Sequence, residues 1–124
     1  MKNRRRTTIE VLAVGSEMLT PYHLDTDSLF LTQHLNTLGL QVSFKTVVGD
    51  KNDDLAACVK AALQRSDVIF LIGGLGPTRD DLTREAVASI LDKRLLFQEF
   101  LWEEIQDRFL RRGISISEVN RKQA

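Results

Sequence analysis

A glycine-rich segment near the middle of the chain combines residue types that could bind a phosphate group. Gly73-Gly74-Leu75-Gly76 follows the unbroken apolar run 68–72. Four polar residues come next: Thr78, Asp80, Asp81 and Thr83. Glycines have no Cβ, so backbone N–H groups can approach a phosphate closely, and a helix beginning near Arg84 would add partial positive charge. In this interpretation Thr83 is the N-cap of that helix.

The adjacent acids Asp80 and Asp81 suggest a metal ion beside the phosphate, because carboxylates repel a phosphate unless a divalent cation lies between them. The segment is not a Walker A loop, since no Gly-Lys-Ser/Thr follows, and it lacks the G-x-G-x-x-G spacing of dinucleotide-binding proteins. A tight turn with solvated acids is the alternative interpretation. The pattern as a whole favours an anion-binding loop with an associated metal ion.

Strands and helices are predicted to alternate along most of the chain. Apolar runs predict strands at Ile9–Val14, Leu40–Val48 and Val68–Ile72. Helical periodicity predicts helices at Ser28–Leu38, Asp53–Arg65, about 84–91 and Gln98–Arg112. Lys93–Phe97 fits either a short edge strand or a plain connection. This alternation predicts an α/β fold with a parallel sheet, in which 68–72 is a central strand buried on both faces.

Polar clusters follow each predicted strand, at the edge where ligands bind in open parallel sheets. These clusters, with one that opens the first helix, are Gly15-Ser16-Glu17, Gly49-Asp50, the glycine-rich segment and Asp25-Thr26-Asp27. We therefore expect one crevice surrounded by six carboxylates: Glu17, Asp25, Asp27, Asp50, Asp80 and Asp81. Such a cluster predicts Mg²⁺-like ions that bridge acids and phosphate oxygens. Plainer roles are also open to these acids, such as helix N-capping by Asp25 or Asp27 and a turn position for Asp50.

The composition limits the remaining function classes. The 124 residues allow one domain, predicted to span 9–124 after a flexible basic arm at 1–8. Lys and Arg number 17, as do Asp and Glu, so no global charge favours a nucleic-acid partner. Cys58 is the single cysteine, and no apolar run reaches transmembrane length, which predicts a cytoplasmic protein without a membrane partner.

The C-terminal pattern predicts an incomplete domain. Ser115-Ile116-Ser117-Glu118 fits a capping box, and the chain ends inside the helix that this box would start. We therefore expect the fold to be truncated, with further strands following Ala124. A sheet without its last strands has an open edge, from which we expect a homo-oligomer.

Four segments carry a resemblance to a known family: Ile9–Glu17 (IEVLAVGSE), Thr46–Asp50 (TVVGD), Gly73–Thr83 (GGLGPTRDDLT) and Asn120–Ala124 (NRKQA). They look like the N-terminal domain of the CinA family (competence/damage-inducible protein A), part of the wider MoaB/MogA-type molybdopterin-binding superfamily. The resemblance runs from about Thr8 to the last residue. It implies a three-layer α/β sandwich with a mostly parallel sheet and a crevice for a pterin phosphate or a nucleotide.

The resemblance also implies roles for individual residues. In relatives the loop corresponding to Gly73–Thr78 holds the phosphate, and family acids fall on Asp50 and Asp81. Domains of this kind are associated with ADP-ribose pyrophosphatase activity, which implies Mg²⁺, Mn²⁺ or Co²⁺ held by Asp50 and Asp81, with Asp80 assisting catalysis. Asp27 stands where the family usually has Asn. Two alternatives remain open: a pterin- or nucleotide-binding module without turnover, and a molybdopterin adenylyltransferase.

Overall fold

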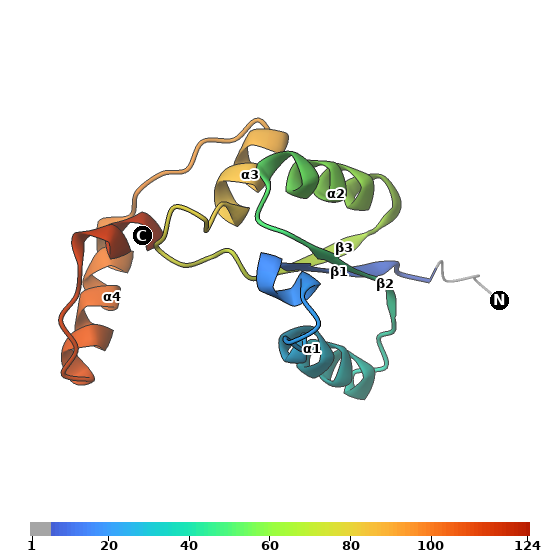
Figure 1. The fold of residues 1–124 in the computed structure, drawn as a ribbon, viewed down its shortest axis with the longest axis horizontal. Helices are drawn as coiled ribbons and strands as arrows, with labels where there is room; N and C mark the ends of the chain where they lie inside the picture. The colour runs from blue at the N-terminus through green and yellow to red at the C-terminus, as the bar shows by residue number, and fades with distance from the viewer. Residues whose placement is uncertain (1–5) are drawn as a thin grey trace.

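The computed structural model describes residues 6–124 and has an α/β architecture (Figure 1). Its strands are β1 (Ile9–Val14), β2 (Val42–Val48) and β3 (Val68–Ile72). Its helices are α1 (Thr26–Thr37), α2 (Asn52–Arg65), α3 (Thr83–Ile90) and α4 (Glu99–Arg111), with the 3-10 helices η1 (Ser16–Leu19) and η2 (Glu118–Gln123). The predicted strands and α-helices are all present, with boundaries that agree to within about two residues. Over residues 6–124, none of the helices is both long enough and apolar enough to cross a membrane.

The three strands form a parallel sheet in the order β2-β1-β3, so that β1 is the central strand. Every residue of β1 is buried, whereas β3 lies at the edge of the sheet built by residues 6–124 and is only partly buried. The prediction that 68–72 is a central strand buried on both faces is therefore wrong. Glu10 interrupts the apolar pattern of β1, so β3 looks more buried in sequence although it has a neighbour on one side only.

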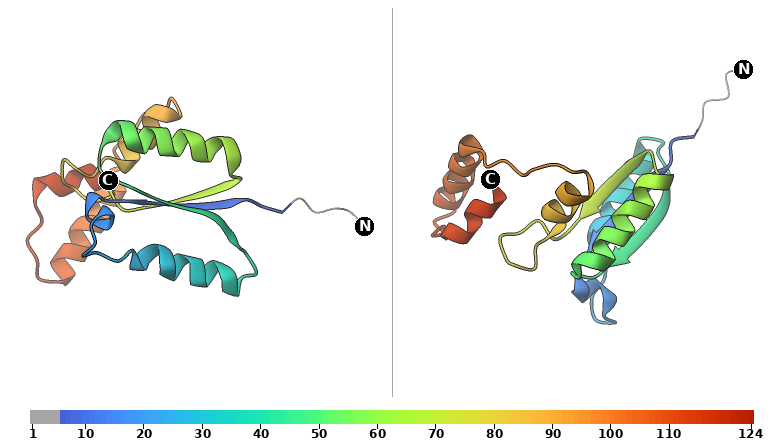
Figure 2. Two further views of the ribbon diagram at one scale, coloured as in Figure 1. Left: turned by 45° about the vertical axis from the view of Figure 1, so that its right-hand side comes forward. Right: turned by 90° about the horizontal axis from the view of Figure 1, so that it is seen from above.

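Helices cover both faces of the sheet, which gives three layers (Figures 1 and 2). α1 lies on one face, and α2 and α3 lie on the other. A cluster of buried apolar side chains joins the sheet to α2 and α3: Leu12, Val14, Val48, Leu55, Val59, Ala62 and Ala86. The spacing of Leu55, Val59 and Ala62 places them on one face of α2, as its periodicity predicted. The predicted three-layer α/β fold with a parallel sheet is confirmed.

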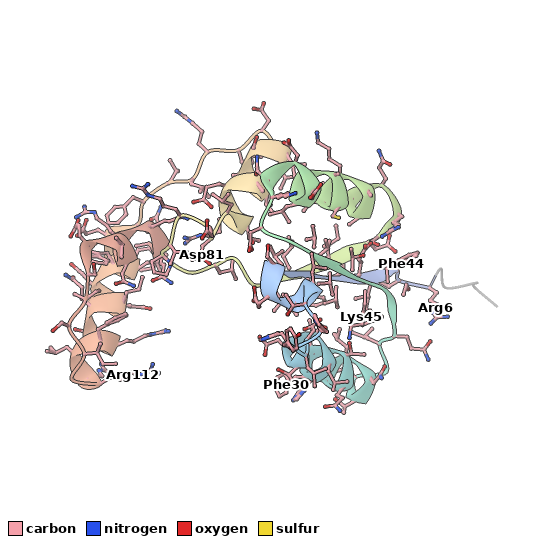
Figure 3. All side chains as sticks on the ribbon, in the orientation of Figure 1. Arg6, Phe30, Phe44, Lys45, Asp81 and Arg112 are labelled. Atoms are coloured by element: carbon pink, nitrogen blue, oxygen red, sulfur yellow. The ribbon has the colours of Figure 1, made fainter. Side chains whose placement is uncertain are left out.

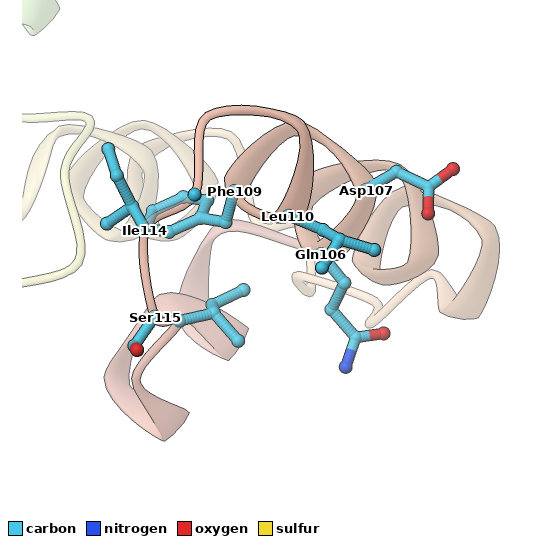
Figure 4. Close-up of a pocket in the computed structure, with 8 residues that line it drawn as sticks. Gln106, Asp107, Phe109, Leu110, Ile114 and Ser115 are labelled. Atoms are coloured by element: carbon cyan, nitrogen blue, oxygen red, sulfur yellow. The ribbon is translucent and has the colours of Figure 1, made fainter.

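The C-terminal lobe, residues 98–124, contains α4 and η2 and lies beside the sheet (Figure 1). Residues 93–97 form an exposed connection to it, so the edge-strand alternative is wrong. Trp102 is the buried side chain of α4, while the predicted inward residues Leu101, Ile105 and Phe109 are half-buried. A cavity of about 510 Å³ lies where the end of α4 meets 113–116 (Figure 4).

The segment after α4 differs from the predicted capping box at Ser115. The N-cap is Ser117, whose backbone N–H donates to Asn120 Oδ1 over 3.2 Å. The helix that follows is the 3-10 helix η2, in which the side chain of Asn120 is buried. Ser117 and Asn120 form a capping box two residues after the one predicted from Ser115 to Glu118. A capping box was therefore predicted correctly, but its position was wrong.

The predicted basic arm, 1–8, falls mostly outside the described residues. At residues 6–8 the chain contacts the sheet. Arg6 donates to the side-chain oxygen of Gln41, and the N–H of Thr8 donates to Asp67 Oδ2 over 2.8 Å. The carbonyl of Thr8 accepts from the N–H of Val68. Residues 6–8 are therefore attached to the strands on both sides of β1.

A buried carboxylate lies in the central strand. Glu10 is fully buried and accepts from Arg65 Nε (3.0 Å), Arg65 Nη2 (2.5 Å) and Ser66 Oγ (2.8 Å). The Arg65 guanidinium also lies 4.2 Å from the ring centroid of Phe44, the β2 residue paired with Glu10. The hydrogen bonds from Arg65 hold the pKa of Glu10 below its usual value, because they favour the charged form. This ion pair connects the C-terminal end of α2 to the middle of the sheet.

Replacing Glu10 by Gln should destabilise the fold at neutral pH by roughly 1–3 kcal/mol, because Arg65 and Ser66 lose a charged acceptor. Since the folded pKa of Glu10 is lowered from its usual value of 4.5, its stabilisation is complete above that value, which applies to the unfolded chain. That stabilisation is lost as the pH falls through the lower, folded pKa. Urea unfolding at neutral pH and at about pH 3 measures both effects. A Glu10→Gln penalty of equal size at the two pH values would contradict this assignment.

Candidate phosphate-binding site at the end of the sheet

The carboxyl ends of β1 and β2 are joined by reciprocal contacts, as the parallel topology predicted. The N–H of Gly15 donates to the carbonyl of Val48 over 2.9 Å. Beyond this contact, the N–H of Ser16 donates to Asp50 Oδ2 (3.1 Å) and the N–H of Asp50 donates to Ser16 Oγ (3.0 Å). The predicted ligand residue Ser16 and the predicted catalytic residue Asp50 therefore lie together. Their polar groups also fix the two strand ends to each other.

The glycine loop, defined here as residues 73–78, follows β3 and contacts the end of β1. Gly73 and Gly74 have φ angles of +88° and +63°. A Cβ on Gly73 would lie 2.1 Å from the carbonyl oxygen of Val14, and one on Gly74 would lie 2.2 Å from Thr83 Oγ1. Both conformation and space therefore require glycine at these two positions.

Thr83 holds the glycine loop from the side of α3. Its hydroxyl donates to the carbonyl of Gly73 over 2.9 Å, and its N–H donates to the carbonyl of Gly74 over 3.2 Å. α3 begins at Thr83 itself, and its N-cap is Leu82. The prediction that Thr83 is the N-cap is therefore wrong, because its hydroxyl serves the loop carbonyl instead. Thr83 is buried, and its predicted role in ligand binding stays a prediction.

The two adjacent acids after the loop have different environments. Asp81, labelled in Figure 3, accepts at Oδ2 from the hydroxyl (2.6 Å) and the backbone N–H (2.8 Å) of Thr78. These bonds close a turn over 78–81. The hydroxyl of Thr78 is the largest cause of a lowered pKa at Asp81. Asp80 is exposed, and its carboxylate bonds to no group among residues 6–124. Asp81 therefore shapes the loop, while Asp80 is available to a ligand.

The remaining predicted site residues are spread along the same end of the sheet. Asp25 is the N-cap of α1, where it accepts from the N–H of Ser28 over 3.0 Å and from the Ser28 hydroxyl. Asp27 is exposed in the first turn of α1. The carboxylate of Glu17 lies over Gly15, where an added Cβ would be 2.5 Å from Glu17 Oε1. The capping role for Asp25 is therefore confirmed.

The six predicted carboxylates do not form one cluster. Across residues 6–124, no three His, Cys, Asp or Glu side chains are placed so that they could hold a metal ion. Asp25 caps a helix, Asp50 binds Ser16, and Asp81 closes a turn. The expectation that all six acids surround one crevice is therefore wrong, while the divalent metal itself stays a prediction. A parallel sheet brings the strand ends together, but caps and turns direct individual side chains to other partners.

The backbone of the glycine loop supplies the chemistry that an anion needs. The N–H groups of Gly74 and Leu75 donate to no acceptor among residues 6–124, and Leu75 is exposed. The loop leads into the N-terminus of α3, which carries partial positive charge. Open backbone donors next to a helix N-terminus form the usual arrangement for binding a phosphate oxygen.

Sequence reasoning missed residues of the C-terminal lobe that contact this region. Lys122, in the C-terminal lobe, donates from Nζ to the carbonyls of Thr78 and Asp81. The only sequence signal was its place in the NRKQA segment, which carried no chemical role. No local pattern reveals a contact between residues so far apart in the chain.

A family model described as "Probable molybdopterin binding domain" (MoCF_biosynth) matches residues 10–123. The chain is 48% identical over 115 residues to a CinA-like protein of Koribacter versatilis, with 93% of this chain and 28% of the relative covered. It is 47% identical over 115 residues to a CinA-like protein of Solibacter usitatus, with the same two coverages. The chain therefore spans 28% of the length of these curated relatives.

Solved structures show the same architecture. The structure of CinA, a protein of unknown function from Thermoplasma acidophilum, superposes with a TM-score of 0.80 at 30% identity and covers 95% of this chain and 68% of that chain. The molybdopterin biosynthesis enzyme MoaB from Thermus thermophilus superposes with a TM-score of 0.65 at 20% identity, with 91% and 67% covered. The second similarity concerns the fold alone.

Replacing Gly73 by Ala should destabilise the protein far more than replacing Gly39 by Ala. Both glycines have positive φ, +88° and +75°, so both changes carry a backbone cost of about 1 kcal/mol. Only Gly73 lies against another strand, since a Cβ on Gly39 meets nothing within 4 Å. Thermal unfolding of the two variants measures the difference. Equal losses of stability would show that the contact between the loop and β1 is unimportant.

Proposed function

The chain belongs to the family of probable molybdopterin-binding domains and, within it, to the CinA-like proteins, and we propose that it binds a phosphate-bearing pterin or nucleotide at the glycine loop. The observation that carries this proposal is the pair of open backbone N–H groups at Gly74 and Leu75. They lie between the end of the central strand and the start of α3, so the site is held on both sides. A fixed group of donors binds an anion without first being ordered.

A second candidate function is metal-dependent hydrolysis of ADP-ribose or a related nucleoside diphosphate sugar. The observation that favours it is the exposed Asp80 carboxylate, which has no partner among residues 6–124 and follows the loop directly. Residues 6–124 provide no cage of metal ligands. Single acids still fit Mg²⁺ or Mn²⁺, because such ions commonly take one or two carboxylates and complete their shell with substrate phosphates and water. Asp80 is the side chain that would hold such an ion, with at most one of the predicted acids Asp50 and Asp81 beside it, and the ion would polarise the pyrophosphate.

Calorimetry with ADP-ribose in the absence of metal tests the binding proposal. The natural chain should bind it saturably, and Gly76→Ala should weaken binding by about tenfold. A Cβ on Gly76 would lie 2.6 Å from Asp81 Oδ2, so the Asp81 carboxylate must shift and its bonds to Thr78 should weaken. Gly113→Ala controls for a glycine change outside the loop: its Cβ meets nothing within 4 Å, and its φ of +65° makes the change cost stability but should leave affinity unaltered. Equal affinities for the natural chain and Gly76→Ala would remove the loop from the site.

The same proteins test hydrolysis when Mg²⁺, Mn²⁺ or Co²⁺ is added and AMP release is measured. We expect Asp80→Asn to lower turnover by on the order of a hundredfold while metal-free affinity is unchanged. Asp81→Asn should lower both, because it also weakens the turn that Thr78 forms. Binding without AMP release would favour the alternative of a module without turnover. Adenylylation of molybdopterin in the presence of ATP would favour the transferase instead.

A homo-oligomer is a further part of this proposal. Large apolar side chains are exposed on α1 and just before it: Tyr22 (94%), Leu24 (81%) and Phe30 (61%), the last labelled in Figure 3. Exposed apolar groups that lie near one another are typical of contact surfaces between proteins. Sedimentation of the chain at several concentrations measures its assembly, and a monomer at every concentration would refute the expectation.

A further inference from the structure

We propose that Lys122 is a positioning residue, which from the C-terminal lobe fixes the turn that shapes the phosphate-binding loop. The turn is residues 78–81, whose two end carbonyls both accept from Lys122 Nζ. The proposal rests on the proposed function, because it assigns Lys122 to the same binding site. It concerns a contact across 44 positions of sequence, which neither the loop motif nor the helix pattern indicates.

The ammonium group of Lys122 contacts three oxygens, two of them through hydrogen bonds. Nζ donates to the carbonyl of Thr78 over 2.9 Å and to the carbonyl of Asp81, and it lies 3.3 Å from Glu85 Oε1. An ammonium has three N–H donors and no acceptor. Two of its donors bind loop carbonyls, and its charge is paired with Glu85. These contacts support a role through the loop rather than a contact with the phosphate.

Lys122 and the Asp81 side chain close the same turn from two directions. Asp81 Oδ2 binds the N–H and hydroxyl of Thr78, while Lys122 binds the carbonyls of both residues. The N–H of Asp81 adds a weaker bond of 3.3 Å to the carbonyl of Thr78. Hydrogen bonds with a charged donor or acceptor are stronger than neutral ones, so Lys122 and the Asp81 carboxylate should each stabilise the turn more than the bond between its two backbone groups.

The lobe holds Lys122 in place through neighbouring contacts. The N–H of Gln98 donates to the carbonyl of Ala124 over 2.9 Å, which joins the start of α4 to the residue after η2. Asn120 Nδ2 donates to Gln123 Oε1 over 3.2 Å, and Gln123 Nε2 reaches the carbonyl of Leu75 at 3.5 Å. The end of η2 therefore lies next to the glycine loop, as the position of the C-terminus in Figure 1 shows. Movement of the lobe would be transmitted to the loop through these residues.

The test compares Lys122→Met, which keeps the length of the side chain and removes its donors, with Lys60→Met as control. Lys60 is an exposed residue of α2 outside the site. Amide hydrogen exchange in the ligand-free protein should become about tenfold faster at Asp81 in Lys122→Met and stay unchanged at β1. Affinity for ADP-ribose should fall by about tenfold, and Lys122→Arg should restore part of it. Lys60→Met should change neither quantity.

The outcomes separate the two proposals. Unchanged exchange at Asp81 in Lys122→Met would overturn the positioning role, whatever the affinity. If the natural chain binds no ADP-ribose but exchange at Asp81 still rises, the proposed function fails while the positioning of the turn stands. Should Lys122→Met not fold, NMR of the lysine ammonium groups in the natural chain decides. Ammonium protons of Lys122 that exchange with water as fast as those of Lys60 would overturn the proposal.

Discussion

The close approach of the Gly73 backbone to the end of the central strand sets the position of the whole site. A Cβ at Gly73 would lie 2.1 Å from the carbonyl oxygen of Val14, so the glycine loop starts against the most buried element of the fold. Thr83 then binds the carbonyls of Gly73 and Gly74 from α3. The loop is therefore held between a strand and a helix. Phosphate binding in this account is a property of backbone placed by the sheet.

Charged groups in this protein mainly connect elements to one another. At the start of β1, Glu10 and Arg65 join the sheet to the end of α2. At the opposite end of the sheet, Lys122 joins the C-terminal lobe to the turn that Asp81 closes. Each of these carboxylates has a lowered pKa because hydrogen-bond donors favour its charged form. Asp80 differs, since it is exposed beside the loop and contacts none of these groups.

The sequence was sufficient for the element order, the parallel sheet and the glycine loop, because periodicity and glycine spacing are local properties. It was insufficient for the strand order, because an apolar run such as 68–72 does not say how many neighbours a strand has. The sequence was also insufficient to show that the six predicted acids do not form one cluster. Asp25 had both a capping and a metal-binding interpretation, and only the bond to Ser28 decides between them. Contacts of Glu10 and Lys122 depend on tertiary packing, which no short pattern reports.

Backbone amide NMR during a titration with ADP-ribose can show which N–H groups bind the phosphate, because it reports each N–H group of the loop separately. We expect the largest shifts at Gly74 and Leu75, with smaller ones at Thr78. Residues around the cavity of the C-terminal lobe, 106–116, should hardly change. Shifts confined to that cavity, with Gly74 and Leu75 unaltered at saturation, would contradict the assignment of the glycine loop as the phosphate-binding site.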